Sequence, residues 1–233
     1  MTERIAMFHE WNELSFVHWP YPADAVQRLL PPGLTAETYD GQAWVGLVPF
    51  RLRIRHRRTP YMPWACAFPE TNVRTYVRGP DGRTGIWFLS LDAARLGAVA
   101  MARATFQLPY MWAHMRVATT ATTRTYESTR HRPHRRAHSK LVVDVGAPTG
   151  TDDLAAFLTN RFLMWTQQGD RFTVVQAQHE PWHLRRGTIV DLDPGLLTAA
   201  GLPEPAGEPV VHVADDMAVT LRPRTGLGAG IAG

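Results

Sequence analysis

Residues 70–74 carry three polar side chains at alternating positions. The segment reads ETNVR, with Glu70, Asn72 and Arg74 at every second place. A strand directs such residues to one face of its sheet, so these side chains are expected to lie together. On an exposed face they would form an ordinary polar row. On a face that lines an interior, a buried carboxyl, amide and guanidinium need partners or a function.

A second candidate is the segment ARATFQLPY, in which Arg103 precedes Tyr110 by seven residues. A tyrosine has a reference pKa of about 10, so it is a neutral hydrogen-bond donor at pH 7. A tyrosine donor, a glutamate base and an arginine that holds an anion are the groups that acid–base catalysis on a small acid or ketone needs. The residues assigned here as catalytic are Glu70, Tyr110 and Arg103. The residues assigned here as substrate-binding are Arg74, Asn72, Trp87, His18 and His114.

The segment RHRPHRRAH, residues 130–138, is strongly basic. Such a run can bind phosphates or nucleic acid. A nucleic-acid site usually adds stacking aromatics or a recognisable module, and neither is adjacent to this segment. A solvated hairpin loop is therefore the preferred interpretation, and nucleic acid is not expected as a partner.

Three other groupings also have simpler explanations. The histidines of 131–138, and the pair His179 and His183, lack a nearby carboxylate in a recognised motif, so no metal site is predicted. Ser90 and Asp92 share one face of an expected strand, but a G-x-S-x-G nucleophile motif is absent. Cys66 is the single cysteine, which excludes an internal disulfide.

The composition is that of an ordinary globular protein, with 45% hydrophobic and 20% charged residues among 233. No stretch approaches the ~20 apolar residues that span a bilayer. The first residues are charged where a signal peptide has its apolar segment, so a cytoplasmic location without a membrane partner is expected. Lys140 is the only lysine, which leaves a single side-chain amine for imine chemistry. The sequence is compatible with a homo-oligomer as well as with a monomer.

Strand-type segments dominate the chain. A hairpin is predicted around GPDG at 79–82, and helices are predicted near residues 23–30, 93–106, 152–167 and 194–202. No alternation of strand, helix and parallel strand is evident. The pattern predicts a mainly β, α+β fold, with an antiparallel sheet or barrel and two or three peripheral helices. Residues 1–222 are expected to form a single domain, followed by a flexible glycine-rich tail at 223–233.

Long motifs place the chain near a known family. LLPPGL, DGQAWVGLVPF, FPETNVRTYV, GIWFLSLDA, ARATFQLPY, FLTNRFLMW, HEPWHL and LDPGLL follow in this order. Together they closely resemble the YqjF-like family of conserved bacterial proteins, which has no assigned function. The resemblance runs from Trp11 to Val219.

A more distant resemblance is to acetoacetate decarboxylases. ADAVQRLLPPGL is similar to the opening of that family, Glu70 falls where it has a pocket glutamate, and Arg103 to Pro109 matches its Arg-x5-Pro spacing. The next residue in that family is the imine-forming lysine, and here it is Tyr110. The resemblance implies a cone-shaped antiparallel β-barrel with an internal pocket. It does not imply decarboxylation, because a tyrosine cannot form an imine.

The expected function is therefore that of a protein with an internal pocket for a small, anionic molecule. Acid–base catalysis on an oxo or carboxylic acid, without Schiff-base chemistry and without a cofactor, is the leading hypothesis. The alternative is a non-catalytic small-molecule binding protein that uses the same pocket.

Overall fold

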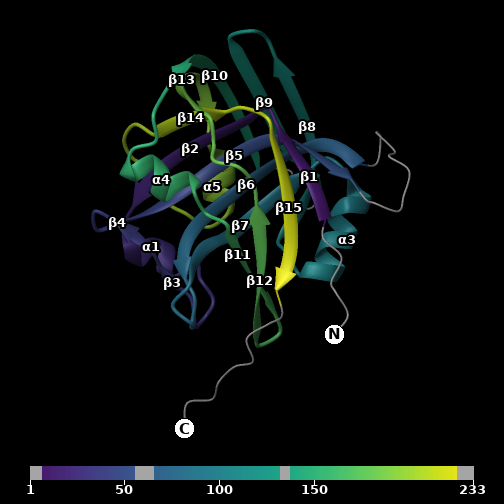
Figure 1. Ribbon diagram of the computed structural model, residues 1–233, viewed down its shortest axis with the longest axis vertical. Helices are drawn as coiled ribbons and strands as arrows, with labels where there is room; N and C mark the ends of the chain where they lie inside the picture. The colour runs from purple at the N-terminus through teal and green to yellow at the C-terminus, as the bar shows by residue number, and fades with distance from the viewer. Residues whose placement is uncertain (1–6, 56–65, 132–136, 225–233) are drawn as a thin grey trace.

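The computed structural model describes residues 7–55, 66–131 and 137–224 (Figure 1). Its strands are β1 (Met7–Asn12), β2 (Leu14–Tyr21), β3 (Thr35–Ala36), β4 (Thr38–Tyr39), β5 (Gln42–Arg55), β6 (Ala67–Arg78), β7 (Thr84–Ala93), β8 (Tyr110–Thr119), β9 (Thr123–Arg130), β10 (His138–Pro148), β11 (Leu163–Gln168), β12 (Arg171–Gln178), β13 (Leu184–Asp193), β14 (Val210–Ala214) and β15 (Met217–Arg224). Its described helices are α1 (Ala23–Gln27), α3 (Leu96–Phe106), α4 (Asp153–Thr159) and α5 (Gly195–Ala199).

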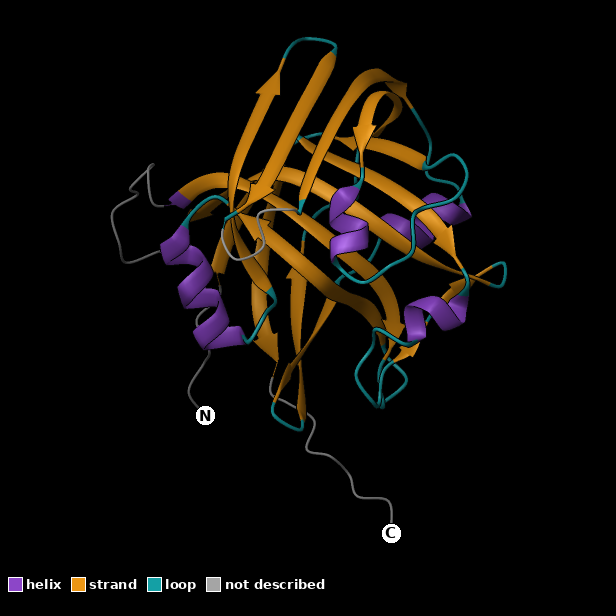
Figure 2. Ribbon diagram, turned by 180° about the vertical axis from the view of Figure 1, so that it is seen from behind, coloured by secondary structure: helices purple, strands orange, loops and turns teal. Residues whose placement is uncertain are grey.

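The strands form two closed rings that share one wall. The first ring runs β5–β6–β7–β11–β12–β15–β1 and returns to β5. The second runs β5–β6–β7–β8–β9–β10–β13–β14–β2 and returns to β5. The described helices lie on the outside of the strands (Figure 2). The predicted mainly β, barrel-like fold is confirmed, with four described helices rather than two or three.

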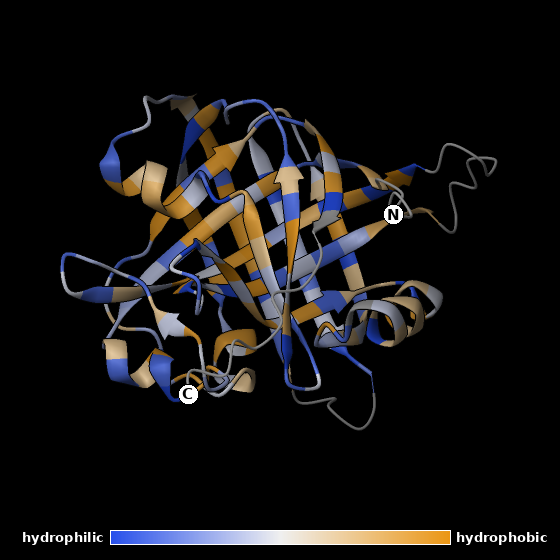
Figure 3. Ribbon diagram, turned by 60° about the horizontal axis from the view of Figure 1, so that its bottom comes forward, coloured by the Kyte–Doolittle hydropathy of each residue, from blue (hydrophilic) through white to orange (hydrophobic). Residues whose placement is uncertain are grey.

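Strand β6 separates two interiors because its side chains alternate between the rings. Glu70, Asn72 and Arg74 face the first ring, whose core includes residues of β1, β12 and β15. Val73 points the other way and joins the core of the second ring, with Tyr126 of β9 among its members. Hydrophobic and hydrophilic residues alternate along many of the strands (Figure 3).

The β6–β7 hairpin forms where the turn residues predict it. The Gly79 N–H donates to the Arg83 carbonyl at 2.9 Å, and Gly82 has a φ of 81°, which glycine adopts without strain. Further along, Val73 pairs with Ser90 but Arg74 pairs with Phe88. This β-bulge shifts the register of β7 by one residue and turns its side chains to the opposite faces.

Helix α3 links two parallel strands. Its C-cap is Gln107, which has a φ of 51° and donates its N–H to the Arg103 carbonyl. The chain then enters β8, which pairs in parallel with β7 through Leu91 and Tyr110. One strand–helix–strand unit is thus present although the sequence pattern did not indicate one. The sheet stays mainly antiparallel, with β7–β8 and β7–β11 as the parallel pairs among the described strands.

The helix predicted at 152–167 is wrong in its second half. Asp152 caps α4 by accepting a hydrogen bond from the Ala155 N–H at 2.7 Å, and the helix ends at Thr159. Residues Leu163–Gln168 instead form β11, paired with β12. A short apolar run fits either a helix or a strand, and here the sheet pairing that buries Trp165 decides.

The last described strand, β15, ends at Arg224, two residues inside the segment assigned to the tail. Residues 225–233 lie outside the described part of the chain. Across residues 7–55, 66–131 and 137–224, no helix is both long enough and apolar enough to cross a membrane.

Candidate active site

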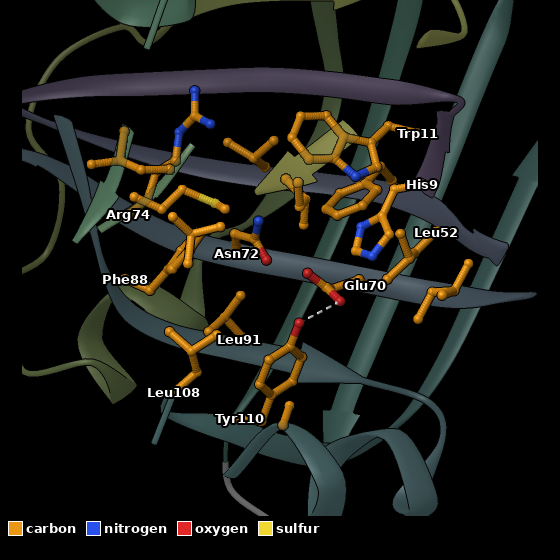
Figure 4. Close-up of a pocket in the computed structure, with 18 of the residues that line it drawn as sticks. His9, Trp11, Leu52, Glu70, Asn72, Arg74, Phe88, Leu91, Leu108 and Tyr110 are labelled. Atoms are coloured by element: carbon orange, nitrogen blue, oxygen red, sulfur yellow. Dashed lines mark hydrogen bonds between the residues drawn. The ribbon is translucent and has the colours of Figure 1, made fainter. Parts of the chain in front are cut away.

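The first ring encloses a cavity of about 140 Å³, referred to below as the central cavity. Polar side chains from β6 and β8 enter an otherwise mostly apolar chamber (Figure 4). Met101 of α3 lines the cavity and is 55% exposed, so the chamber reaches solvent beside α3. The aromatic and aliphatic walls include Trp11, Phe16, Val48, Phe50, Phe88, Leu91 and Trp182.

Glu70 and Tyr110 meet inside the central cavity. The Tyr110 hydroxyl donates a hydrogen bond of 3.0 Å to Oε2 of Glu70. Burial raises the pKa of Glu70 to about 8, and the bond from Tyr110 partly opposes that rise. Burial and the neighbouring Glu70 carboxylate raise the pKa of Tyr110 well above its ordinary value. At neutral pH the pair is therefore a mostly protonated carboxyl and a neutral phenol.

Arg74 is a buried cation in the same cavity, with 7% of its surface exposed. Its Nη2 donates to the Leu158 carbonyl at 3.1 Å, and its guanidinium lies 5.2 Å from the centre of the Phe16 ring. Its Nε has no hydrogen-bond partner, and no carboxylate pairs with it within the described residues. Such a guanidinium suits a ligand carboxylate.

Asn72 lies between these groups on β6. Its amide oxygen has no hydrogen-bond partner in the described part of the protein. The amide and the Glu70 carboxyl point toward one another (Figure 4). A protonated Glu70 can supply the missing donor, whereas an ionised Glu70 would face a second acceptor. This arrangement agrees with the raised pKa of Glu70.

The end of α4 anchors Arg74. The Leu158 carbonyl accepts from Arg74 and, at 2.6 Å, from the Tyr76 hydroxyl. Because that hydroxyl has a single proton, His18 must donate from Nε2 across the 2.7 Å contact to the Tyr76 oxygen. Burial, followed by the charges of Arg74 and His212, holds the pKa of His18 well below its ordinary value. His18 is thus a neutral structural support behind the cavity rather than a lining residue.

Besides His18, three other predicted site residues lie outside the cavity lining. Arg103 is exposed and donates from Nε to the Tyr110 carbonyl at 2.6 Å, so it supports the backbone instead of entering the cavity. His114 is exposed on β8, next to the buried Ala113. Trp87 lines a separate hollow beside Trp165.

The β-bulge explains the error at Trp87. In an unbroken register Trp87 would pair with Tyr76 and share the face of Arg74. The shift of one residue instead places Phe88 opposite Arg74 and Trp87 opposite Thr75. Phe88 accordingly lines the central cavity.

Several cavity residues were missed from the sequence. His9 and Trp11 alternate on β1 and both line the cavity. Tyr76 lies behind the lining, where it supports Arg74 through the Leu158 carbonyl; it continues the alternation of Glu70, Asn72 and Arg74, so the same two-residue period could have identified it. Phe16 required the tertiary structure, because β2 offers apolar residues on both faces.

The Ser90 and Asp92 cluster is a structural network in the second ring. Asp92 is fully buried and bonds Arg130 at 2.9 Å and Ser128 at 2.9 Å. Arg130 also donates to Ser90 at 2.9 Å. The first residue of the basic segment is therefore buried and paired, while residues 132–136 lie outside the described residues. No group of three or more potential metal ligands gathers in the described chain.

Two comparisons decide the family. The model of DUF2071, described as an uncharacterised conserved protein, matches residues 9–218. The uncharacterised protein YqjF of Bacillus subtilis (strain 168) is 34% identical over 220 residues, which cover 93% of this chain and 90% of that protein. The chain belongs to the DUF2071 family. The resemblance predicted from the sequence motifs is confirmed.

This DUF2071 protein shares its fold with acetoacetate decarboxylase-like proteins. The enduracididine biosynthesis enzyme MppR complexed with pyruvate aligns with a TM-score of 0.65 and 16% identity, over 96% of this chain and 91% of that chain. An acetoacetate decarboxylase-like enzyme from Sphingomonas wittichii RW1 aligns at 0.65 and 13% identity, over 95% and 92%. Acetoacetate decarboxylase from Legionella pneumophila aligns at 0.60 and 14% identity, over 96% and 88%. At these identities the similarity shows the fold alone.

The single lysine of this DUF2071 protein is remote from the central cavity. Lys140 lies on β10 and forms an ion pair of 2.7 Å with Asp191. It does not line the cavity, whereas Tyr110 does. The lining of the central cavity therefore contains no lysine amine.

Proposed function

We propose that the central cavity binds a small oxo acid and that Glu70 and Tyr110 move a proton on it without a Schiff base. The observation that carries the proposal is the buried Glu70–Tyr110 hydrogen bond in an apolar chamber that also contains Arg74. A glutamate whose pKa lies near 8 is tuned for proton transfer close to neutral pH.

Arg74 is assigned to the ligand carboxylate. Its guanidinium is buried and has no carboxylate partner in the described residues. An incoming carboxylate would supply the missing counter-charge and accept from the free Nε. This contact orients the ligand so that its carbonyl lies at Tyr110 and Glu70.

The proposed chemistry is reversible proton abstraction from the carbon beside the carbonyl. The ionised form of Glu70 takes the proton, the C–H electron pair forms a carbon–carbon double bond, and the carbonyl π electrons move to oxygen. The Tyr110 hydroxyl stabilises that oxygen by donating a hydrogen bond. Glu70 then returns the proton to carbon. With a pKa of about 8, about one molecule in ten carries the ionised Glu70 at pH 7.

A binding protein without turnover is the second candidate. The observation that favours it is that the Tyr110 hydroxyl already donates to Glu70, so each group has a hydrogen-bond partner within the protein. Such a protein would use Arg74 and the apolar walls to hold an acid, and the Glu70–Tyr110 pair would only offer a polar contact.

Hydrogen exchange separates the two functions. Oxo acids that bind are incubated in D₂O, and NMR follows deuterium entering the carbon beside the carbonyl. An enzyme should exchange this hydrogen, and Glu70→Gln should slow exchange about 10²–10⁴-fold while binding is retained. Glu208→Gln is the control, because Glu208 is exposed and remote from the cavity lining. If the wild type binds an oxo acid but catalyses no deuterium exchange, the protein is a binding protein without turnover.

A further inference from the structure

The two polar ends of the central cavity are far apart along one strand. Glu70 and Arg74 are separated by four residues on β6, which pairs with β5 in an unbroken register from Ala67 to Thr75. At a rise of ~3.3 Å per residue, their Cα atoms lie roughly 13 Å apart. Figure 4 shows Arg74 on one side of the cavity and Glu70 with Tyr110 further along it, with Leu52 beyond Glu70.

Apart from Glu70, Arg74 and Tyr110, the lining is mostly apolar, and its polar members are Asn72, His9 and Thr166. Phe88 and Leu91 of β7 lie on one side, and Val48 and Phe50 of β5 belong to the same lining. A ligand that reaches both polar ends must therefore carry a hydrophobic middle, because a charged or strongly hydrated middle would lose its water without replacement partners.

From this spacing, we propose that the ligand is an elongated oxo acid whose carboxylate and carbonyl are separated by a hydrophobic spacer. The inference rests on the proposed function and names its substrate class. Side chains on one face of a strand stand roughly perpendicular to the sheet, so the Cα separation approximates the spacing of the two polar positions. Allowing a hydrogen bond of about 3 Å at each end leaves roughly 7 Å between the carboxylate and carbonyl oxygens of the ligand. Subtracting a C–O bond of about 1.2 Å at each end leaves roughly 4.5 Å between the two carbons, which an extended chain of C–C bonds of about 1.5 Å spans with at least about four bonds. The short 2-oxo and 3-oxo acids reach only one end.

The size and the aromatic walls of the cavity favour a compact spacer. The volume of about 140 Å³ is close to that of an apolar cavity of ~150 Å³ that holds benzene. Trp11, Phe16 and Phe88 give flat surfaces on which a ring can pack. A benzene ring substituted at its para positions separates the two functional carbons by five bonds.

Isomeric probes test the inference without a change in the protein. 4-Acetylbenzoate and 2-acetylbenzoate have the same atoms and charge but place the carbonyl far from or beside the carboxylate. Calorimetric titration of the wild type should show at least tenfold tighter binding of 4-acetylbenzoate, and of 6-oxoheptanoate over pyruvate. Equal affinity of the two isomers, tighter binding of pyruvate, or no binding of the elongated acids would overturn the proposal.

Two further arms check the end groups. Arg74→Met should weaken 4-acetylbenzoate at least tenfold and leave the affinity of 4-methylacetophenone, which lacks the carboxylate, within about twofold. Arg116→Met is the control, because Arg116 is an exposed arginine outside the lining. 4-Ethylbenzoate lacks the carbonyl. If it binds as tightly as 4-acetylbenzoate, the proposed contact between the ligand carbonyl and the Glu70–Tyr110 pair is contradicted. Deuterium exchange is measured separately. Tighter binding of the elongated acids without deuterium exchange would support this inference and contradict the proposed catalytic function.

Discussion

Tyr110 and Glu70 stand forty residues apart in the chain and are joined by a hydrogen bond of 3.0 Å inside the first ring. Tyr110 begins β8, which pairs with β7 after the α3 crossover, and Glu70 lies on β6, which also pairs with β7. Burial favours the neutral form of both groups; the Glu70 carboxylate further raises the pKa of Tyr110, whereas the hydrogen bond from Tyr110 lowers that of Glu70.

The first prediction concerns stability and pH. The pKa of Glu70 is about 8 in the folded protein and 4.5 as its ordinary value. Between these values the unfolded chain loses the proton that the folded protein keeps, so the Glu70 contribution to the free energy of unfolding falls as pH rises. Glu70→Gln mimics the neutral carboxyl at every pH. Its free energy of unfolding should therefore fall less than that of the wild type as pH rises, by about a few kcal/mol.

Chemical denaturation at pH 5 and pH 9 measures this effect. The variant and the wild type should be similar at pH 5, and the variant should be the more stable of the two at pH 9. Glu208→Gln serves as the control with an exposed carboxyl. A wild type whose difference from Glu70→Gln does not change between these pH values would mean that Glu70 is ionised in the folded protein throughout.

The second prediction concerns the phenol. Tyr110→Phe removes one hydroxyl and little volume. If the protein is an enzyme, deuterium exchange should fall about 10²–10⁴-fold, the usual contribution of a positioned acid or base. If it only binds, the affinity for a bound oxo acid should change by about 0.5–3 kcal/mol. Unchanged exchange and unchanged affinity together would remove Tyr110 from the site.

The third prediction concerns covalent chemistry. Borohydride reduction in the presence of acetoacetate should leave no stoichiometric adduct on a lysine side chain, because Lys140 lies outside the cavity and is held by Asp191. Intact-mass and peptide mass spectrometry measure the adduct. A stoichiometric reduced adduct that maps to Lys140 would show that the ligand site has been misplaced.

The fourth prediction concerns Gly46, which faces His18 across the β2–β5 pair. A Cβ at Gly46 would lie 2.7 Å from ring atoms of His18, whose ring is buried and bonded to Tyr76. Gly46→Ala should lower the free energy of unfolding by about 1–3 kcal/mol, the usual cost of overpacking. It should also weaken oxo-acid binding, because the same network anchors Arg74.

Thermal and chemical denaturation measure the stability of this variant. Gly97→Ala is the matched control, because a Cβ at Gly97 meets no atom within 4 Å. That control should be neutral or slightly stabilising, since alanine favours a helix. A Gly46→Ala protein with wild-type stability would show that the His18 ring can move without loss.

Local patterns in the sequence determined the strands, the hairpin turn and one face of the site. Alternation along β6 predicted that Glu70, Asn72 and Arg74 share a face, and all three line the central cavity. The GPDG turn predicted the hairpin, and the motifs predicted the family and its fold. These features depend on neighbouring residues or on long matches, so a single chain carries them.

Only the tertiary structure decided which residues meet across the rings. The β-bulge beside Arg74 exchanged Trp87 for Phe88, and α3 turned Arg103 outward while it brought Tyr110 to Glu70. The division between α4 and β11 likewise depended on pairing with β12. Register shifts and parallel crossovers are set by contacts between distant segments, whose energies no local pattern in the sequence records.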